Sequence, residues 1–169
     1  MDTDFGQFAG SAWPRLYRSM YAVARDRQAA EDAVQSALIK TQLNWDRVCD
    51  AEEPLAYVRR IALNTLLAER RRPWARREIT IPNHDLMPSG SVPAAQDGVP
   101  ARIGVLDAIR ALPPRQRAII VLRYYDDLSE SQIADALGCR PSTVKSQAAA
   151  ALATLRRTLG AIDLAEENQ

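Results

Sequence analysis

Cysteine and histidine are scarce in this chain, and their scarcity restricts the chemistry that it can perform. Its 169 residues include two cysteines and one histidine. Because Cys49, His84 and Cys139 are far apart in the sequence, they predict neither a disulfide framework nor a zinc-ligand cluster. We therefore expect no metal and no other cofactor, and a protein of the cytoplasm.

Long hydrophobic runs are also absent. The longest stretch without Asp, Glu, Lys or Arg is the eleven residues Leu86–Gln96, which is too short to span a bilayer and contains two prolines. The N-terminus carries Asp2 and Asp4 instead of a basic start followed by an apolar run, so no secretory signal is expected. These observations exclude a membrane protein.

The overall composition, with 47% apolar and 25% charged residues, is typical of a globular protein. The net charge of +1 conceals two basic parts: residues 1–77 have 13 basic and 10 acidic side chains, and residues 102–160 have 9 and 5. Between them, residues 78–101 have 3 acids, no base and four of the ten prolines. Prolines at this density predict a linker, whose 24 residues reach roughly 80 Å when extended.

The predicted fold class is therefore all-α, with two small helical domains joined by a flexible, Pro-rich, acidic linker. We call residues 5–77 the N-terminal module and residues 102–160 the C-terminal module. In the N-terminal module, apolar residues recur at steps of three and four over 31–45, which predicts a helix. A second helix begins near Pro54 and ends in Arg70-Arg71-Arg72.

Aromatic residues accompany the arginines of the N-terminal module. An aromatic ring beside an arginine can stack on an unpaired base while the cation contacts a phosphate. The residues that favour this interpretation are Trp45, Arg47, Tyr57 and Trp74. The alternative is a solvated helix end whose arginines complement the helix dipole. For three further aromatics, Trp13, Tyr17 and Tyr21, we expect core packing.

The C-terminal module has the pattern of a helix-turn-helix. A short helix stops at Pro113-Pro114, and a second ends near Tyr124. Ser129 and Gln132 predict a capping box, and Gly138 predicts a left-handed helix end. Ser142 or a neighbour is expected to cap the last helix, whose outer face carries Lys145, Ser146 and Gln147. An ordinary αα-hairpin is the alternative.

Several segments, in order, resemble the motifs of one family. They are Glu31–Gln35, Pro54–Asn64, Leu112–Arg117, Leu128–Ala134 and Thr143–Gln147. Together they are similar to the extracytoplasmic-function group of bacterial sigma-70-type sigma factors, in particular to an actinobacterial sigma-E-like branch. The resemblance implies an RNA polymerase initiation subunit. Its N-terminal module would bind the polymerase clamp and melt the −10 element, and its C-terminal module would bind the flap and read the −35 element.

The resemblance also implies roles for individual residues. Implied contacts with core polymerase are Asp32, Gln35, Leu38 and Ile39. Implied contacts with the −10 element are Asn44, Trp45, Arg47, Tyr57, Arg60, Asn64, Arg70 and Arg71, with residues 44–53 as a base-capturing loop. Implied contacts with the −35 element are Arg123, Ser142, Thr143, Lys145, Ser146, Gln147 and Arg156. Whether an anti-sigma factor is a further partner stays open.

The chain departs from the family at a few positions. Ser36 replaces a usual acid, and Ala68 replaces a frequent Asp. Ala149 and Ala150 stand where relatives often carry larger or basic side chains, and alanine packs on a thymine methyl but cannot hydrogen-bond a base. We therefore expect unusual or weak reading of the −35 element.

Two other functions compete with a sigma factor. A dimeric helix-turn-helix regulator that needs no core polymerase explains residues 102–160, but it gives no role to the helix with Asp32 and Gln35. An enzyme is disfavoured because the adjacent Glu31 and Asp32 diverge by about 100° on a helix. The chain also lacks a Gly-rich phosphate-binding loop.

Overall fold

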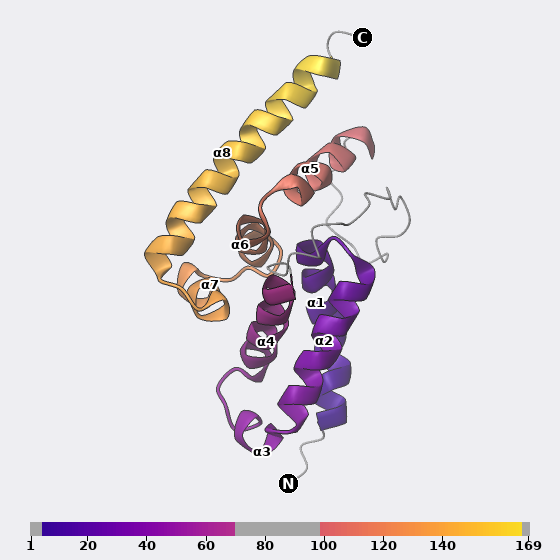
Figure 1. Cartoon of the computed structure of the whole chain (residues 1–169), viewed down its shortest axis with the longest axis vertical. Coiled ribbons are helices and arrows are strands. Elements are labelled where there is room, and N and C mark those ends of the chain that lie inside the picture. Colours follow the sequence, from indigo (N-terminus) through magenta and orange to yellow (C-terminus); the bar gives the residue numbers. More distant parts are fainter. Residues whose placement is uncertain (1–4, 70–98, 167–169) are drawn as a thin grey trace.

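The structure is a computed structural model that describes residues 5–69 and 99–166 (Figure 1). Within these ranges it contains eight α-helices and no strand, which confirms the all-α prediction. The predicted contacts Arg70 and Arg71, together with Trp74 and most of the predicted linker, lie outside the described residues. Among the helices described, none combines the length and the apolar character that crossing a bilayer requires.

The N-terminal module is a bundle in which α2 and α4 pack against α1. Its helices are α1 (Phe5–Ala24), α2 (Arg27–Gln42), α3 (Trp45–Val48) and α4 (Pro54–Glu69). Buried positions on α1, including Leu16, Met20 and Val23, recur at steps of four and three, so they form one apolar stripe that faces Val34 of α2 and Leu63 of α4 in the core.

Two local features shape the N-terminal module: the turn between α1 and α2, and a stack of aromatic rings along α1. Arg25 adopts φ 67° directly after α1, and Asp26 caps α2 by accepting a hydrogen bond from the amide of Ala29 at 3.1 Å. Trp13, Tyr17 and Tyr21 stack along α1, with successive ring centroids 6.2 and 6.1 Å apart, and pack against the core. The core packing expected for these three rings is confirmed.

The C-terminal module contains the predicted helix-turn-helix. Its helices are α5 (Val99–Ala111), α6 (Pro114–Tyr124), α7 (Glu130–Leu137) and α8 (Pro141–Glu166). Ser129 and Gln132 form both hydrogen bonds of the capping box, and Gly138 ends α7 with φ 61°. Two details differ from the prediction. Helix α8 begins at Pro141, so Ser142 lies inside its first turn, and α5 begins at Val99, inside the predicted linker.

The two modules pack against each other, which the sequence did not indicate. Helix α6 contacts α1, and α7 contacts α4 (Figure 1). A single apolar core joins Met20 and Leu66 of the N-terminal module with Ile119, Leu122 and Ile133 of the C-terminal module. A second, smaller cluster lies between α5, α6 and α8. The described residues therefore form one packed body instead of two separated modules.

Candidate functional site

The outer face of α2 presents three of the four predicted polymerase contacts. Asp32 and Gln35 are exposed, and the side chain of Ile39 is 59% exposed. Because these residues are three and four positions apart, they lie on one stripe of the helix, which continues to Leu43, the C-cap residue, at 79% exposure. Asp32 also accepts a hydrogen bond from Nε2 of Gln28 at 2.8 Å. We call this stripe the α2 face. It begins with the polar Asp32 and Gln35 and ends with the large, exposed apolar side chains of Ile39 and Leu43.

The fourth predicted contact, Leu38, does not lie on this face. It is 9% exposed and belongs to the core of the bundle. The sequence pattern assigned Leu38 and Leu43 to the same apolar set, whereas only Leu38 faces inward. Sequence reasoning did not include Leu43 in this exposed stripe, and its position four residues after Ile39 is the signal that could have identified it.

The predicted base-capturing loop, residues 44–53, contains the short helix α3. Trp45 packs against Phe5 and Phe8, with ring centroids 5.3 and 4.9 Å apart, so its ring helps to anchor this segment to the start of α1. Asn44 and Arg47 are exposed, and Nδ2 of Asn44 donates to the carbonyl of Lys40 at 2.9 Å. The segment therefore offers a polar edge to solvent while Trp45 is half-buried behind it.

Tyr57, Arg60 and Asn64 are all exposed on α4, at the three- and four-residue spacing that forms one stripe. This α4 stripe combines an aromatic ring and a cation, which are groups that bind single-stranded DNA, with an amide. Tyr57 and Arg60 also line a cleft of about 210 Å³ between α4 and α7. Asp135 lines its α7 side. The cleft is smaller than the roughly 300 Å³ of a typical small-molecule pocket.

The first turns of α8 bring together part of the predicted −35 surface. Lys145 and Ser146 are exposed, whereas Thr143 is half-buried. Gln147 is also half-buried and accepts a hydrogen bond from Nε2 of Gln116 on α6, at 3.2 Å. The side chain of Gln147 is thus less accessible than those of Lys145 and Ser146, and its oxygen is engaged within the module.

The remaining residues at the predicted −35 surface have small or cationic side chains. Ala149, Ala150 and Arg156 are exposed further along α8, and Ser142 is exposed in its first turn. Arg123, at the end of α6, is half-buried. Its guanidinium lies 3.4 Å from the carboxylate of Glu130 and 5.9 Å from the centroid of the Tyr124 ring. Arg123 is thus held close to the start of α7.

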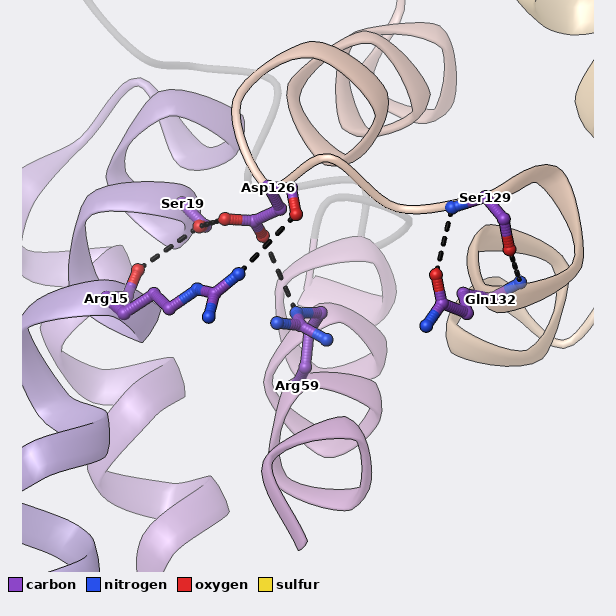
Figure 2. Close-up of polar contacts among 6 residues, drawn as sticks. All are labelled: Arg15, Ser19, Arg59, Asp126, Ser129 and Gln132. Carbon is purple, nitrogen blue, oxygen red and sulfur yellow. Dashed lines mark hydrogen bonds and ion pairs between the residues drawn. The ribbon is translucent and has the colours of Figure 1, made fainter. Parts of the chain in front are cut away.

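Sequence reasoning missed a buried polar cluster where the modules meet (Figure 2). Asp126, in the turn between α6 and α7, is 4% exposed and accepts a hydrogen bond from Oγ of Ser19 at 2.8 Å. Its Oδ2 lies 3.5 Å from Nε of Arg59, and its backbone carbonyl accepts from Arg15 at 3.5 Å. We call this group of side chains the Asp126 contact.

Burial controls the ionisation of the Asp126 contact. It raises the pKa of the Asp126 carboxyl above its ordinary value, although the Ser19 hydroxyl and the guanidiniums of Arg59 and Arg15 oppose the shift. It likewise lowers the pKa of Arg59, although the charge of Asp126 opposes this shift. Both directions have the same cause, which is that removing the pair from water costs more than the attraction between its members returns.

The burial of a second cation, Arg117 of α6, was also not predicted from the sequence. Its guanidinium donates to the carbonyl of Val23 at 2.8 Å, in the last turn of α1. It also donates to the carbonyls of Arg110 and Leu112 at the end of α5. The last carbonyls of a helix lack partners within the helix, so one arginine completes the C-terminal ends of a helix from each module.

Comparisons with known proteins identify the family of the chain. The sigma-70 region 2 family matches residues 11–77, and the sigma-70 region 4 family matches residues 102–155. The RNA polymerase sigma-E factor of Streptomyces avermitilis is 32% identical over 161 residues, which are 95% of this chain and 88% of that protein. The ECF RNA polymerase sigma factor SigL of Mycobacterium tuberculosis is 31% identical over 145 residues, covering 85% of this chain and 82% of that protein.

Solved structures share the fold. The sigma factor RpoE of Bartonella quintana, in complex with the anti-sigma factor NepR, superposes with a TM-score of 0.70 at 24% identity, covering 95% of this chain and 98% of that chain. CnrH, in complex with the cytosolic domain of CnrY, gives 0.60 at 22% identity, with 93% and 88% covered. The resemblance found in the motifs is confirmed: the chain belongs to the extracytoplasmic-function group of sigma-70 RNA polymerase sigma factors.

Proposed function

We propose that this sigma factor binds core RNA polymerase through the α2 face and promoter DNA through α4 and α8. The observation that carries the proposal is the pair of large apolar side chains, Ile39 and Leu43, exposed next to Asp32 and Gln35. Apolar side chains of this size serve as anchors of protein interfaces when a partner removes them from water. Sigma factors are initiation factors without an enzymatic activity of their own, and we place this one in the cytoplasm.

The α4 stripe is our candidate for the −10 element. Tyr57 offers a flat ring for an unpaired base, Arg60 a cation for phosphate, and Asn64 a donor and an acceptor. The exposed Asn44 and Arg47 extend this surface across the base-capturing loop. Trp45 supports the loop from behind through its contacts with Phe5 and Phe8.

The start of α8 is our candidate for the −35 element, with α7 as the preceding helix of the helix-turn-helix. A recognition helix reads bases with the residues of its first turns, where Lys145 and Ser146 are exposed. Ala149 and Ala150 allow close approach and contact with thymine methyl groups, but they form no hydrogen bonds to bases. Arg156 lies further along the helix, where a cation serves the DNA backbone.

The dimeric-regulator alternative is not favoured. It uses only the C-terminal module, whereas both modules match sigma-70 regions and the exposed apolar pair lies on the N-terminal module. Because both solved relatives described above are in complexes, one of them with an anti-sigma factor by name, an anti-sigma factor is a candidate partner. We propose that such a partner would compete with core polymerase for the α2 face.

In-vitro transcription with core polymerase and the purified chain, followed by mapping of the start sites, tests the proposal. We expect new start sites that depend on the added chain, and weak binding of the chain alone to duplex DNA, because its basic excess is small and divided between the modules. Tight promoter protection by the chain alone at physiological salt, with no stimulation of polymerase, would instead support the dimeric regulator.

A further inference from the structure

One hydrogen bond joins the predicted recognition helix to the helix that precedes the helix-turn-helix. Nε2 of Gln116, in the first turn of α6, donates to Oε1 of Gln147 on α8 at 3.2 Å. We propose that Gln116 is a specificity-determining residue of this chain: it holds the amide of Gln147 against α6 and so keeps a side chain that can read adenine from reading the −35 element. The inference deepens the proposed function and rests on its assignment of α8 to DNA.

The place of Gln147 on α8 is the first argument. Val144, Ala148 and Ala151 are buried in the cores that α8 shares with α6. Gln147 is half-buried and lies three positions after Val144 and four before Ala151, so it stands at the edge of this buried stripe. The exposed Ser146 points elsewhere, because neighbouring residues of a helix diverge by about 100°. Gln147 therefore leaves α8 on its flank, beside α6.

Recognition of adenine by a glutamine needs both ends of the side-chain amide. The oxygen accepts from the N6 amino group of the base while the NH₂ group donates to N7, and both must point into the major groove. In this chain the oxygen of Gln147 already accepts from Gln116, which fixes the plane of the amide and directs that oxygen toward α6. Gln147 therefore cannot present both groups to one base while this hydrogen bond is intact.

Partial burial favours the hydrogen bond over release of the two side chains to solvent. Gln116 and Gln147 are each half-buried. A polar group that is partly removed from water costs free energy when it loses its partner. The helices that carry the pair are held together by apolar side chains, among them Ile120 of α6 and Ala151 of α8. The hydrogen bond is thus supported by the packing of α6 against α8.

The exposed face of α8 has little other capacity to read bases. The hydroxyl of Ser146 donates to the carbonyl of Thr143 at 3.1 Å, and the alanines that follow form no hydrogen bonds with bases. Lys145 is left as the long exposed side chain in the first two turns of the helix. Because the hydrogen bond to Gln116 withholds Gln147 from this face, it sets how broad a range of −35 sequences the chain accepts.

Selection from a randomised −35 element, with holoenzymes that contain the full chain, tests the proposal. Gln116→Leu removes the donor and keeps a side chain of similar size on α6. We expect it to enrich adenine at one −35 position by about fivefold or more over the wild type, because the released amide of Gln147 can then contact the base bidentately. Gln116→Ala removes the same donor without adding apolar atoms and should show the same enrichment. An unchanged motif in both variants would overturn the proposal.

A double variant decides whether the gain acts through Gln147. Gln116→Leu with Gln147→Ala lacks the released amide, so the adenine enrichment should disappear. A structural effect of Gln116→Leu on α6 would instead persist in the double variant, and its persistence would overturn the role of Gln147. Gln147→Ala alone should select the wild-type motif, because the wild-type side chain is already held against α6.

A matched control changes Gln116 but keeps Gln147 engaged. In Gln116→Glu the carboxylate accepts from the amide nitrogen of Gln147, so the amide stays against α6 after it turns over. We expect the wild-type motif at every position, with affinity lowered evenly because the added charge repels DNA phosphates. Adenine enrichment as large as in Gln116→Leu would overturn the proposal, because the gain would not depend on losing the hydrogen bond. Circular dichroism should show unchanged helix content for each variant.

Nuclear magnetic resonance of the free chain separates this inference from the proposed function. We expect Overhauser contacts between the side-chain amide protons of Gln116 and the Hγ protons of Gln147, and their absence would overturn the hydrogen bond. If these contacts are present but no holoenzyme, wild type included, selects a −35 motif, the proposed function fails and the specificity role fails with it. If the wild type selects a motif and both Gln116→Leu and Gln116→Ala select the same one, this inference alone fails.

Discussion

The two modules expose different chemistry on the helices that we assign to binding. In the N-terminal module, α2 presents the large apolar side chains of Ile39 and Leu43 to solvent. In the C-terminal module, the exposed face of α8 presents Lys145 and Ser146, followed by alanines. Burial of large apolar groups by a protein partner lowers the free energy of the complex, whereas a cation followed by small side chains allows a helix to enter a DNA groove. On the basis of this difference, we expect the first surface to bind polymerase and the second to bind DNA.

The largest expected effect comes from making the α2 face charged. Ile39→Asp with Leu43→Asp should weaken binding to core polymerase by about 4 kcal/mol, roughly a thousandfold, because two apolar anchors are lost and two carboxylates must be desolvated. Competition for core polymerase with a labelled wild-type chain measures the change. Gln7→Asp, an exposed position on α1, is the control and should bind normally. Normal binding by the double variant would remove the contrast between the two modules.

Arg117 tests how far the modules depend on each other. Arg117→Met removes hydrogen bonds to the ends of α1 and α5 and should lower the free energy of unfolding by about 2–3 kcal/mol, because the carbonyls stay buried without donors. Urea unfolding followed by circular dichroism measures the loss. Arg115→Met is the control on the same helix, because Arg115 makes a single long hydrogen bond, to the carbonyl of Leu137 at 3.4 Å, and should cost less than about 1 kcal/mol. Equal losses for both variants would contradict the role of Arg117.

The α8 face can be resolved residue by residue. Lys145→Ala should relax the preference at one or two −35 positions by about 1–2 kcal/mol, whereas Arg156→Ala should lower affinity evenly across sequences. Gln147→Ala should leave the selected sequence unchanged, because its oxygen accepts from Gln116. Selection from a randomised −35 element by each holoenzyme measures these effects. A changed motif with Gln147→Ala alone would show that Gln147 reads bases despite this bond.

The smallest expected effect concerns acidity. Burial against Ser19 and Arg15 of α1 and Arg59 of α4, with Asp127 beside it, raises the pKa of Asp126 in the folded chain. The folded chain therefore takes up a proton at Asp126 more readily than the unfolded chain. The stability that this group contributes is fully present below the ordinary pKa of an aspartate and is lost as pH rises through the raised pKa. The free energy of unfolding, measured with urea at several pH values, should decrease over this range by more in the wild type than in Asp126→Asn, whose side chain does not titrate. An equal decrease in both proteins would contradict the direction of the shift.

Local signals made much of the fold predictable. Ser129, Gln132 and Gly138 act within a few residues of their own positions, and their geometry followed from the sequence. Apolar spacing also predicted α4 and the body of α2, but the helix predicted over 31–45 ends at Gln42, and α3 was not predicted. The distinction between Leu38 and Leu43 did not, because periodicity defines an apolar stripe but not where the neighbouring helices stop covering it.

Contacts between distant residues were not predictable in this way. Asp126 meets Ser19 across 107 positions of sequence, and Arg117 meets Val23 across 94. Nothing in the sequence around Asp126 distinguishes it from Asp127, although one is buried and the other exposed. Which of the two aspartates is buried depends on the backbone of the α6–α7 turn, in which Asp127 adopts φ 53°, and on the packing of the N-terminal module against this turn. The hydrogen bond from Gln116 to Gln147 likewise joins residues 31 positions apart, and the sequence did not predict it.

The aromatic contact between Trp45 and the first turn of α1 bears on how the protein is best produced for assays. Phe5 and Phe8 hold the base-capturing loop, so α1 starts beside the surface that we assign to the −10 strand. An affinity tag fused ahead of Phe5 would lie next to that surface and interfere with promoter opening. The end of α8 lies at the opposite end of the molecule from α3 (Figure 1). A tag placed after α8 leaves the loop and its aromatic anchor undisturbed.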